Sequence, residues 1–95
     1  MQDLKNRYKN FAIETGELIL QLPTNTINGA YSNQLIRFSS SPGTNYRAAC
    51  GGKSTADFIN KLKIVEEELD ESMHFLELVQ HFNPKNSNVY QNCPT

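Results

Sequence analysis

Apolar residues recur along most of this chain at alternating steps of three and four, which is the spacing of one face of an α-helix. The first such segment runs from about residue 3 to residue 22. Its stripe consists of Leu4, Tyr8, Phe11, Thr15, Leu18 and Leu22. Pro23 ends the segment, because proline lacks a backbone N–H and disfavours the helical conformation of the residue before it. Gly16 lies inside the segment, where it either allows a neighbouring helix to approach closely or is neutral.

The second helical segment runs from about residue 30 to residue 50. Its stripe consists of Tyr31, Leu35, Phe38, Pro42, Tyr46 and Ala49. Thr26 or Asn28 is expected to cap it. Its centre, residues 39–44, is a poor helix former, so it is either one kinked helix or two helices joined by a turn. Periodicity that continues through Pro42 favours the kinked helix, and Gly51-Gly52 is expected to end it.

The third segment is expected to begin after Ser54, which lies three residues before Asp57 in a pattern close to the capping box. Two apolar stripes follow on the same helix. The first consists of Phe58, Leu62, Val65, Leu69, Met73, Leu76 and Val79, and the second of Ile64, Phe75, Leu78 and Phe82. A helix with two apolar faces packs on both sides, and in so short a chain we expect one side to meet another subunit. Asn83-Pro84 ends the helix.

These patterns predict an all-α chain of one domain. No strand-like alternation of useful length occurs, and 95 residues allow only a modest core. We assign residues 1–82 to a helical bundle domain. Residues 83–95, which are rich in Asn, Ser and Pro, are expected to be a polar tail in a loop or disordered conformation.

The composition indicates the cellular compartment of the protein and the state of its cysteines. No apolar run approaches the roughly 18 residues that span a bilayer, and the first residues lack the pattern of a signal peptide. We therefore expect a cytoplasmic protein without membrane association. Cys50 and Cys93 lie far apart without a CxxC spacing, so we expect free thiols.

The charge is unevenly distributed along the chain. The net charge is −1, which argues against strong attraction of the whole molecule to nucleic acid. Residues 1–53 nevertheless carry six basic and three acidic side chains, and residues 54–95 carry three basic and seven acidic ones. The asymmetry either serves an anionic partner or, as we favour, reflects packing between segments or subunits.

Several short motifs together resemble one family. They are Gln34-Leu35-Ile36-Arg37, Ser41, Asn45-Tyr46-Arg47-Ala48-Ala49, Ser54, Asp57-Phe58-Ile59, Lys61-Leu62 and the run from Val65 to Ser72, with Lys9-Asn10-Phe11-Ala12 and Leu22-Pro23 upstream. Over about residues 4–82 the chain resembles the bacterial four-helix-bundle family known as 23S rRNA-intervening-sequence proteins.

The resemblance implies an up-and-down antiparallel helical bundle that assembles as a homo-oligomer, usually a pentamer. A related branch contains accessory proteins of retroelements that bind nucleic acid and a reverse transcriptase. This chain departs from the family in three ways. Many relatives carry the proline one position after Pro42, the retroelement branch is basic, and relatives continue into a fourth helix that is missing or truncated here.

No catalytic or metal-binding constellation is complete in the sequence. Glu71 and His74 have the spacing of a di-iron ligand pair, but such a site needs a second pair and further carboxylates. His81 is expected to pair with Glu77 on the surface. Residues 39–41 are serines without a partner histidine or a nucleophile elbow. We therefore expect no enzyme activity, no cofactor, no metal and no small-molecule substrate.

The middle of the second segment is the most function-like cluster. Tyr46 and Arg47 have the chemistry to stack on a base and grip a phosphate. In the alternative, which we favour, Asn45 satisfies backbone groups freed by Pro42, Tyr46 packs, and Arg47 pairs with an acid. We expect Ser41 to allow close helix packing and Arg37 to bind a carboxylate of the acidic run Glu66-Glu67-Glu68.

Two functions follow from these expectations. The first is a non-catalytic, oligomeric helical bundle that assembles or docks a protein. The second is an accessory protein that binds RNA or DNA. The candidate contacts for nucleic acid are Lys5, Arg7, Lys9, Arg47 and Lys53.

Overall fold

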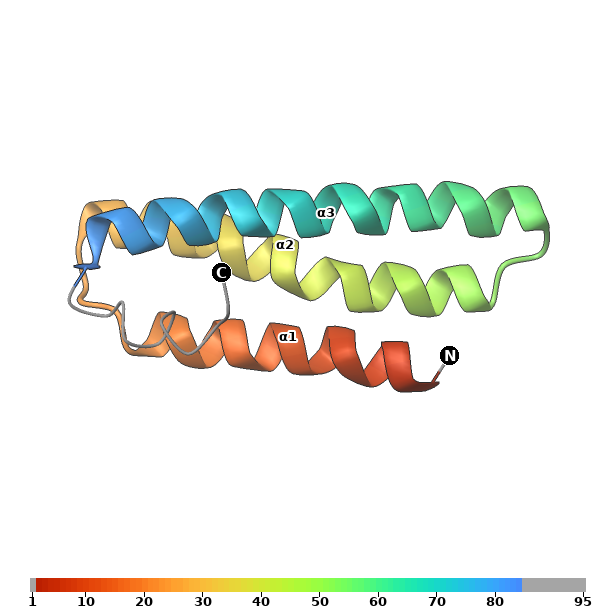
Figure 1. The fold of residues 1–95 in the computed structure, drawn as a ribbon, viewed down its shortest axis with the longest axis horizontal. Helices are drawn as coiled ribbons and strands as arrows, with labels where there is room; N and C mark the ends of the chain where they lie inside the picture. The colour runs from red at the N-terminus through yellow and green to blue at the C-terminus, as the bar shows by residue number, and fades with distance from the viewer. Residues whose placement is uncertain (1, 85–95) are drawn as a thin grey trace.

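The computed structural model describes residues 2–84, which form three helices connected by short loops (Figure 1). They are α1 (Gln2–Leu20), α2 (Thr26–Cys50) and α3 (Thr55–Phe82). The helices run antiparallel to one another in chain order, so the start of α1, the end of α2 and the start of α3 lie at the same end of the molecule (Figure 1). The described chain is an all-α helical bundle, as the periodicity predicts.

Helix α2 begins earlier than the sequence suggests. Its N-cap is Asn25, whose side chain accepts a hydrogen bond from the backbone N–H of Asn28 at 2.8 Å. The prediction of Thr26 or Asn28 as the cap is therefore wrong, because both residues lie inside the first turn. Gly51 ends the helix as expected, although its φ of −91° is not the left-handed conformation that favours glycine.

The predicted cap of α3 is confirmed. Ser54 has an extended backbone, and its hydroxyl oxygen accepts a hydrogen bond from the backbone N–H of Asp57 at 3.1 Å. The carboxylate of Asp57 also lies in the first turn, at the positive end of the helix dipole. The helix runs for 28 residues and ends at Asn83-Pro84, as predicted.

Pro42 lies within one continuous helix, so the two-helix alternative is wrong. Its ring is fully buried, among the most buried side chains of the bundle. A proline at this place removes one helical N–H, and two serine hydroxyls bond backbone carbonyls nearby. Ser41 donates to the carbonyl of Arg37 at 2.9 Å, and Ser39 donates to the carbonyl of Ile36 at 3.3 Å.

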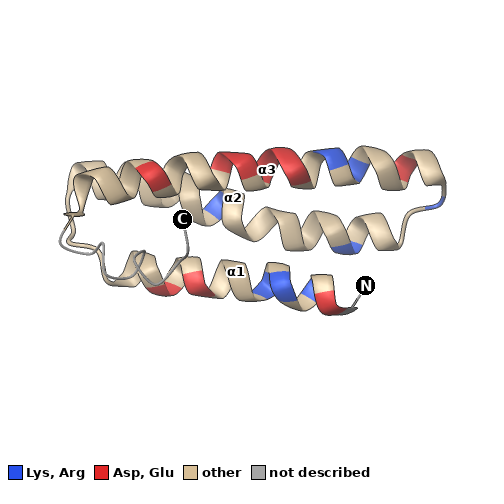
Figure 2. Ribbon diagram, in the orientation of Figure 1, with Lys and Arg blue, Asp and Glu red and all other residues tan. Residues whose placement is uncertain are grey.

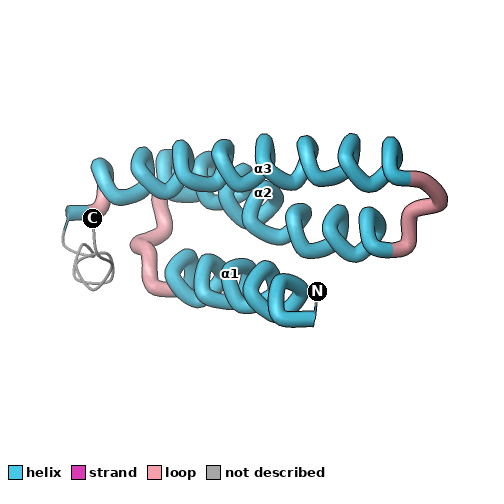
Figure 3. The backbone as a smooth tube through the Cα atoms, turned by 45° about the vertical axis from the view of Figure 1, so that its right-hand side comes forward, coloured by secondary structure: helices cyan, strands magenta, loops and turns pink. Residues whose placement is uncertain are grey.

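Helix α2 is the centre of the described bundle. It packs against both α1 and α3, whereas α1 and α3 barely contact each other (Figure 3). The fully buried Leu35 lies near the middle of α2. The three helices therefore occupy three corners of a bundle with α2 at the middle corner. Of the predicted tail, residues 83–95, the structure describes Asn83 and Pro84, and Asn83 is buried in the bundle. Residues 85–95 lie outside the described part.

Aromatic rings join α2 to α3. Phe38 stacks on Phe75 with ring centroids 5.9 Å apart and planes 6° apart. Tyr31 contacts Phe75 at 6.1 Å and Phe82 at 5.9 Å. Because Phe75 and Phe82 are seven residues apart, they lie on one flank of α3, and this flank faces α2.

The contact between α1 and α2 combines one ring pair with the close approach of two glycines. Tyr8 packs edge-on against Tyr46 with ring centroids 5.3 Å apart. The backbone of Gly43 lies against Tyr8, and Gly16 lies against the end of the Ile36 side chain. None of the helices in residues 2–84 is both long and apolar enough to cross a membrane.

A substitution of Gly16 shows whether the packing of α1 on α2 requires a glycine at this position. A Cβ added there would meet Ile36 at 3.7 Å, an ordinary van der Waals distance. Gly16→Ala should therefore stabilise the protein by about 0.5–1 kcal/mol, because alanine loses less backbone entropy on folding. The measurement is the free energy of unfolding from urea titration.

Gly52→Ala is the control for this prediction. The added Cβ would lie 3.0 Å from the carbonyl oxygen of Ala49, a backbone atom with little freedom to move. This variant should lose stability. A loss of stability in Gly16→Ala as well would show that the two helices need a glycine at their crossing.

Candidate functional site

The predicted cluster on α2 divides into residues that pack and residues that face solvent. Tyr46 is only 3% exposed, with its ring against Tyr8, so it is not available to stack on a base. Its expected packing role is what the geometry shows. Arg47, the next residue, is exposed on the outer surface.

Asn45 does not serve the backbone near Pro42, as the sequence suggested. Its side-chain amide donates instead to Glu68 Oε1 on α3 at 2.8 Å. The prediction was wrong because Asn45 lies on the flank of α2 that faces α3. Asn45 therefore links the acidic run of α3 to α2.

Arg37 also differs from the prediction. Its side chain is exposed, and its guanidinium lies 5.9 Å from the centroid of the Phe38 ring. It does not bind a carboxylate of α3, because it points to another side of α2 than Asn45. Within residues 2–84 the sole ion pair joins the exposed side chains of Arg7 and Asp3, at 3.3 Å. Arg47 and His81 therefore also lack the acidic partners expected for them.

The environment of the Tyr46 hydroxyl is unfavourable for its ionised form. Burial raises the pKa of Tyr46 above its ordinary value of 10.0. A side-chain hydrogen bond with Cys50, and the proximity of Cys50 and Tyr8, raise the pKa further. All of these causes favour the neutral phenol.

The five predicted nucleic-acid contacts gather at one end of the bundle (Figure 2). Lys5, Arg7 and Lys9 lie in the first half of α1, Arg47 at the end of α2, and Lys53 in the loop that follows. Two more cations, Lys61 and Lys63, join them from the first third of α3. We call these seven residues the basic end. Sequence reasoning missed the last two because they lie in the acidic half of the chain.

The acidic side chains lie mostly beyond the basic end. Asp3 and Asp57 share that end with the seven cations, whereas the other described carboxylates are at the middle or the opposite end of the bundle (Figure 2). The latter are Glu14, Glu17, Glu66, Glu67, Glu68, Asp70, Glu71 and Glu77. Antiparallel packing has therefore turned an uneven sequence into a molecule with a charge gradient along its 46 Å axis.

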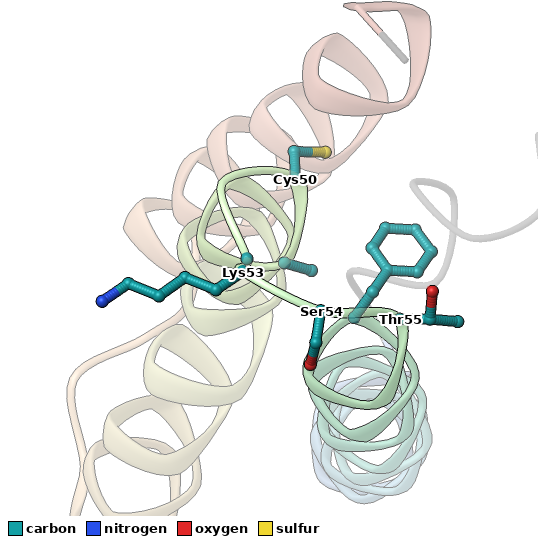
Figure 4. Close-up of a pocket in the computed structure, with 7 residues that line it drawn as sticks. Cys50, Lys53, Ser54 and Thr55 are labelled. Carbon is teal, nitrogen blue, oxygen red and sulfur yellow. The ribbon is translucent and has the colours of Figure 1, made fainter.

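A hollow of about 470 Å³ lies beside the loop between α2 and α3 (Figure 4). Its lining includes Cys50, Lys53, Ser54 and Thr55. The Lys53 side chain extends away from Cys50 and Thr55, and the Ser54 hydroxyl caps α3. The polar groups do not converge on a common point, so the hollow has none of the geometry of a ligand site.

Metal ligands are not gathered in the described residues. No group of three or more His, Cys, Asp or Glu side chains there has a metal-binding arrangement. The His74 ring lies edge-on to Phe75, at 5.3 Å between centroids, and is exposed.

Sequence reasoning missed a buried pair of asparagines at the other end of the bundle. Asn28 Nδ2 donates to Asn83 Oδ1 at 2.9 Å, and Asn83 Nδ2 donates back to Asn28 Oδ1 at 2.7 Å. The same two amides also donate to the carbonyls of Pro23 and Val79, at 2.7 and 2.8 Å. Their exposed fractions are 3% and 6%. This amide pair ties the loop after α1, the start of α2 and the end of α3 together.

The residue that follows each asparagine of this amide pair suggested a turn or a helix end rather than a buried contact. Asn28 precedes a glycine and Asn83 precedes a proline, and both dipeptides mark turns or helix ends. The pair could have been predicted from the topology, because the start of α2 and the end of α3 lie side by side when the two helices are antiparallel.

Comparison with known protein families, characterised proteins and solved structures finds no match to this chain.

The raised pKa of Tyr46 predicts a loss of stability at high pH. Above about pH 10 the phenol ionises readily in the unfolded chain but not in the folded one. The tyrosine therefore has no effect on pH dependence below that value, and stability falls as the pH rises through the window between the unfolded and the folded pKa. The measurement is the free energy of unfolding at pH 8 and pH 10.5, compared between the wild type and Tyr46→Phe.

Tyr46→Phe should lose less stability between these two pH values than the wild type. Tyr31→Phe is the control, because that ring is only half-buried. Equal losses in the wild type and Tyr46→Phe would contradict an unfavourable environment for the ionised phenol.

Proposed function

We propose that this protein is a non-catalytic assembly module that associates with further copies of itself through an unpartnered face of the bundle. The support comes from how the stripe of α3 is used. Val65, Ser72 and Val79 recur every seven residues and are at most 1% exposed, so they form the buried centre of the stripe. Glu68, Phe75 and Phe82 flank this centre on one side and contact α2.

The other side of the same stripe makes no ring contact or side-chain hydrogen bond to another helix within residues 2–84. It consists of Leu62, Leu69, Met73 and Leu76, which we call the open flank. The three leucines are half-buried, and Met73 is 46% exposed. A helix with an apolar flank on each side of its buried centre is shaped for two neighbouring helices, and α2 is only one of them.

Helix α1 has a matching feature. Leu4, Phe11 and Leu18 recur every seven residues on one side of the helix. Leu18 is buried, whereas Leu4 is 38% exposed and Phe11 is half-buried. Because α1 and α3 barely contact each other, we place these residues and the open flank beside a corner of the bundle that no helix of residues 2–84 occupies. Exposed apolar surface of this kind is typical of interaction sites.

The charge gradient favours a second copy as the partner. Two copies placed antiparallel would bring the basic end of each against the acidic stretch of the other, which lowers the electrostatic energy of the pair. The resemblance to the 23S rRNA-intervening-sequence family supports self-association, since it implies a homo-oligomer. The pentamer that is usual in that family would arrange the copies differently from the antiparallel pair. In this proposal the protein acts by assembly, with no substrate or cofactor.

Association through the open flank predicts that a charge at Met73 weakens the oligomer. Met73→Glu would bury an unpaired carboxylate in an apolar contact, so the dissociation constant should rise at least about tenfold. Ile64→Glu is the matched control, because Ile64 lies on the same helix with 45% exposure but outside the open flank. The measurement is molar mass by size exclusion with light scattering, over a range of protein concentrations.

Both variants should keep the helical circular dichroism of the wild type, because both side chains are already half exposed. A wild-type protein that stays monomeric at the highest concentration would overturn the proposal. Equal effects of Met73→Glu and Ile64→Glu would place the contact elsewhere.

The basic end favours a second candidate function, the binding of RNA or DNA. Its support is that the five cations predicted as contacts lie together, with Lys61 and Lys63 beside them. Clustered positive charge is the electrostatic feature of nucleic-acid binding, and oligomerisation multiplies weak contacts. A reverse transcriptase as a further partner belongs to this second candidate.

Nucleic-acid binding by the basic end predicts a specific dependence on salt. Affinity for duplex DNA or structured RNA should fall steeply with added salt, and Arg47→Gln with Lys53→Gln should lower the slope by about one per lost phosphate contact. Arg37→Gln is the control, because Arg37 is exposed but lies outside the basic end. Fluorescence anisotropy over a salt series measures both quantities. Absence of binding at low salt would exclude this function.

A further inference from the structure

Asn28, one member of the buried amide pair, is followed by Gly29, and this is the only Asn-Gly dipeptide of the sequence. In peptides an asparagine followed by glycine is the most prone to deamidation, because glycine has no Cβ to hinder the reaction at its nitrogen. The backbone nitrogen of the glycine attacks the asparagine Cγ and loses its proton, and ammonia leaves. Water then opens the resulting succinimide ring, giving aspartate or isoaspartate.

The folded structure holds each reacting group away from this chemistry. The Gly29 N–H donates to the carbonyl of Asn25 at 2.9 Å, as part of the first turn of α2. The leaving group, Asn28 Nδ2, donates to the carbonyl of Pro23 at 2.7 Å and to Asn83 Oδ1 at 2.9 Å. The attack requires these bonds to break and the first turn of α2 to leave the helical conformation.

The amide pair is therefore the element that has to open first. Asn83 follows the last residue of α3, at a helix end where local opening costs less than in the middle of a helix. Asn83 bonds Asn28 twice and the carbonyl of Val79 once. Separating Asn83 from Asn28 frees the side chain of Asn28 from its longest-range contact.

We propose that Asn28-Gly29 is a self-modification site that the Asn28–Asn83 amide pair holds inactive, and that it deamidates when this end of the bundle opens. The reaction consumes only water and releases ammonia. It goes beyond the proposed assembly function, and it records past openings of the bundle as a permanent covalent change.

The product cannot restore the amide pair. A carboxylate at position 28 has no N–H to donate, so the carbonyl of Pro23 and Asn83 Oδ1 would both lose their donor. Asn28 is only 3% exposed, and an ionised carboxylate at so buried a position is energetically costly. Isoaspartate would in addition lengthen the backbone inside the first turn of α2. Modification therefore favours the open form of this end of the bundle and makes the change permanent in that molecule.

The first test compares deamidation at Asn28 in the folded chain and in the chain unfolded by urea, at the same mildly alkaline pH. Peptide mapping by mass spectrometry gives the fraction of aspartate and isoaspartate at each asparagine. In urea, Asn28 should convert faster than Asn10 and Asn60, which precede bulkier residues. In the folded chain its rate should be at least about tenfold lower. Equal rates in the two states would overturn the proposal.

The second test removes the Asn28–Asn83 amide pair, which in the proposal controls the rate of deamidation in the folded chain. Asn83→Ala removes the partner of Asn28 and should raise the rate in the folded chain about tenfold. Val65→Ala, in the core and far from the amide pair along α3, is a control that lowers global stability. With the two rates compared at urea concentrations that equalise global stability, equal rates would show that the amide pair is not the gate.

Two further measurements keep the proposal testable if Asn83→Ala does not fold. In the wild type, deamidation should accelerate at urea concentrations below those that reduce the circular dichroism, and acceleration only in step with global unfolding would count against a local gate. Gly29→Ala should slow the reaction strongly in urea. A Cβ at Gly29 meets nothing within 4 Å, so this variant also keeps the fold.

Discussion

Packing on both sides of α2 is the constraint on which the rest of the structure depends. Leu35 is completely buried there, the aromatic rings of α3 meet one side of α2, and Tyr8 meets the other. A helix that serves as the middle of three must keep a wide apolar face along its whole length, and this explains why α2 stays helical through Pro42. Serine hydroxyls bond nearby carbonyls, and the buried proline ring contributes apolar contact where a regular hydrogen bond is lost.

The same arrangement creates the apolar and charged surfaces on which the proposed functions depend. Because α1 and α3 both pack on α2 and barely contact each other, each retains a partly exposed apolar flank within the described residues. Because neighbouring helices are antiparallel, cations from all three helices collect at one end, and carboxylates collect toward the other (Figure 2). An apolar flank supplies affinity without direction, whereas the charge gradient favours one orientation of a partner. Together they support self-assembly more directly than any catalytic role.

The opposite ends of the bundle also differ in how they are held together. The basic end closes with the Gly51-Gly52 loop and the Ser54 cap, both of which are local arrangements. The other end closes with the Asn28–Asn83 pair, which joins residues 55 positions apart. A reciprocal pair of buried amides is strong only while both partners are intact, since the loss of either leaves a buried polar group unsatisfied. That makes this end sensitive to chemical change at one side chain.

The sequence by itself determined the helices. Stripes with a period of 3.6 residues, Pro23, Gly51-Gly52 and the Ser54 cap act through neighbours within about one turn, so the all-α class and most helix ends could be predicted. Only the tertiary structure decided which side chains meet across helices. Asn45 rather than Arg37 bonds the acidic run, Lys61 and Lys63 join the basic end, and Asn28 pairs with Asn83. These outcomes depend on the register and rotation of one helix against another, which distant packing sets and no local pattern encodes.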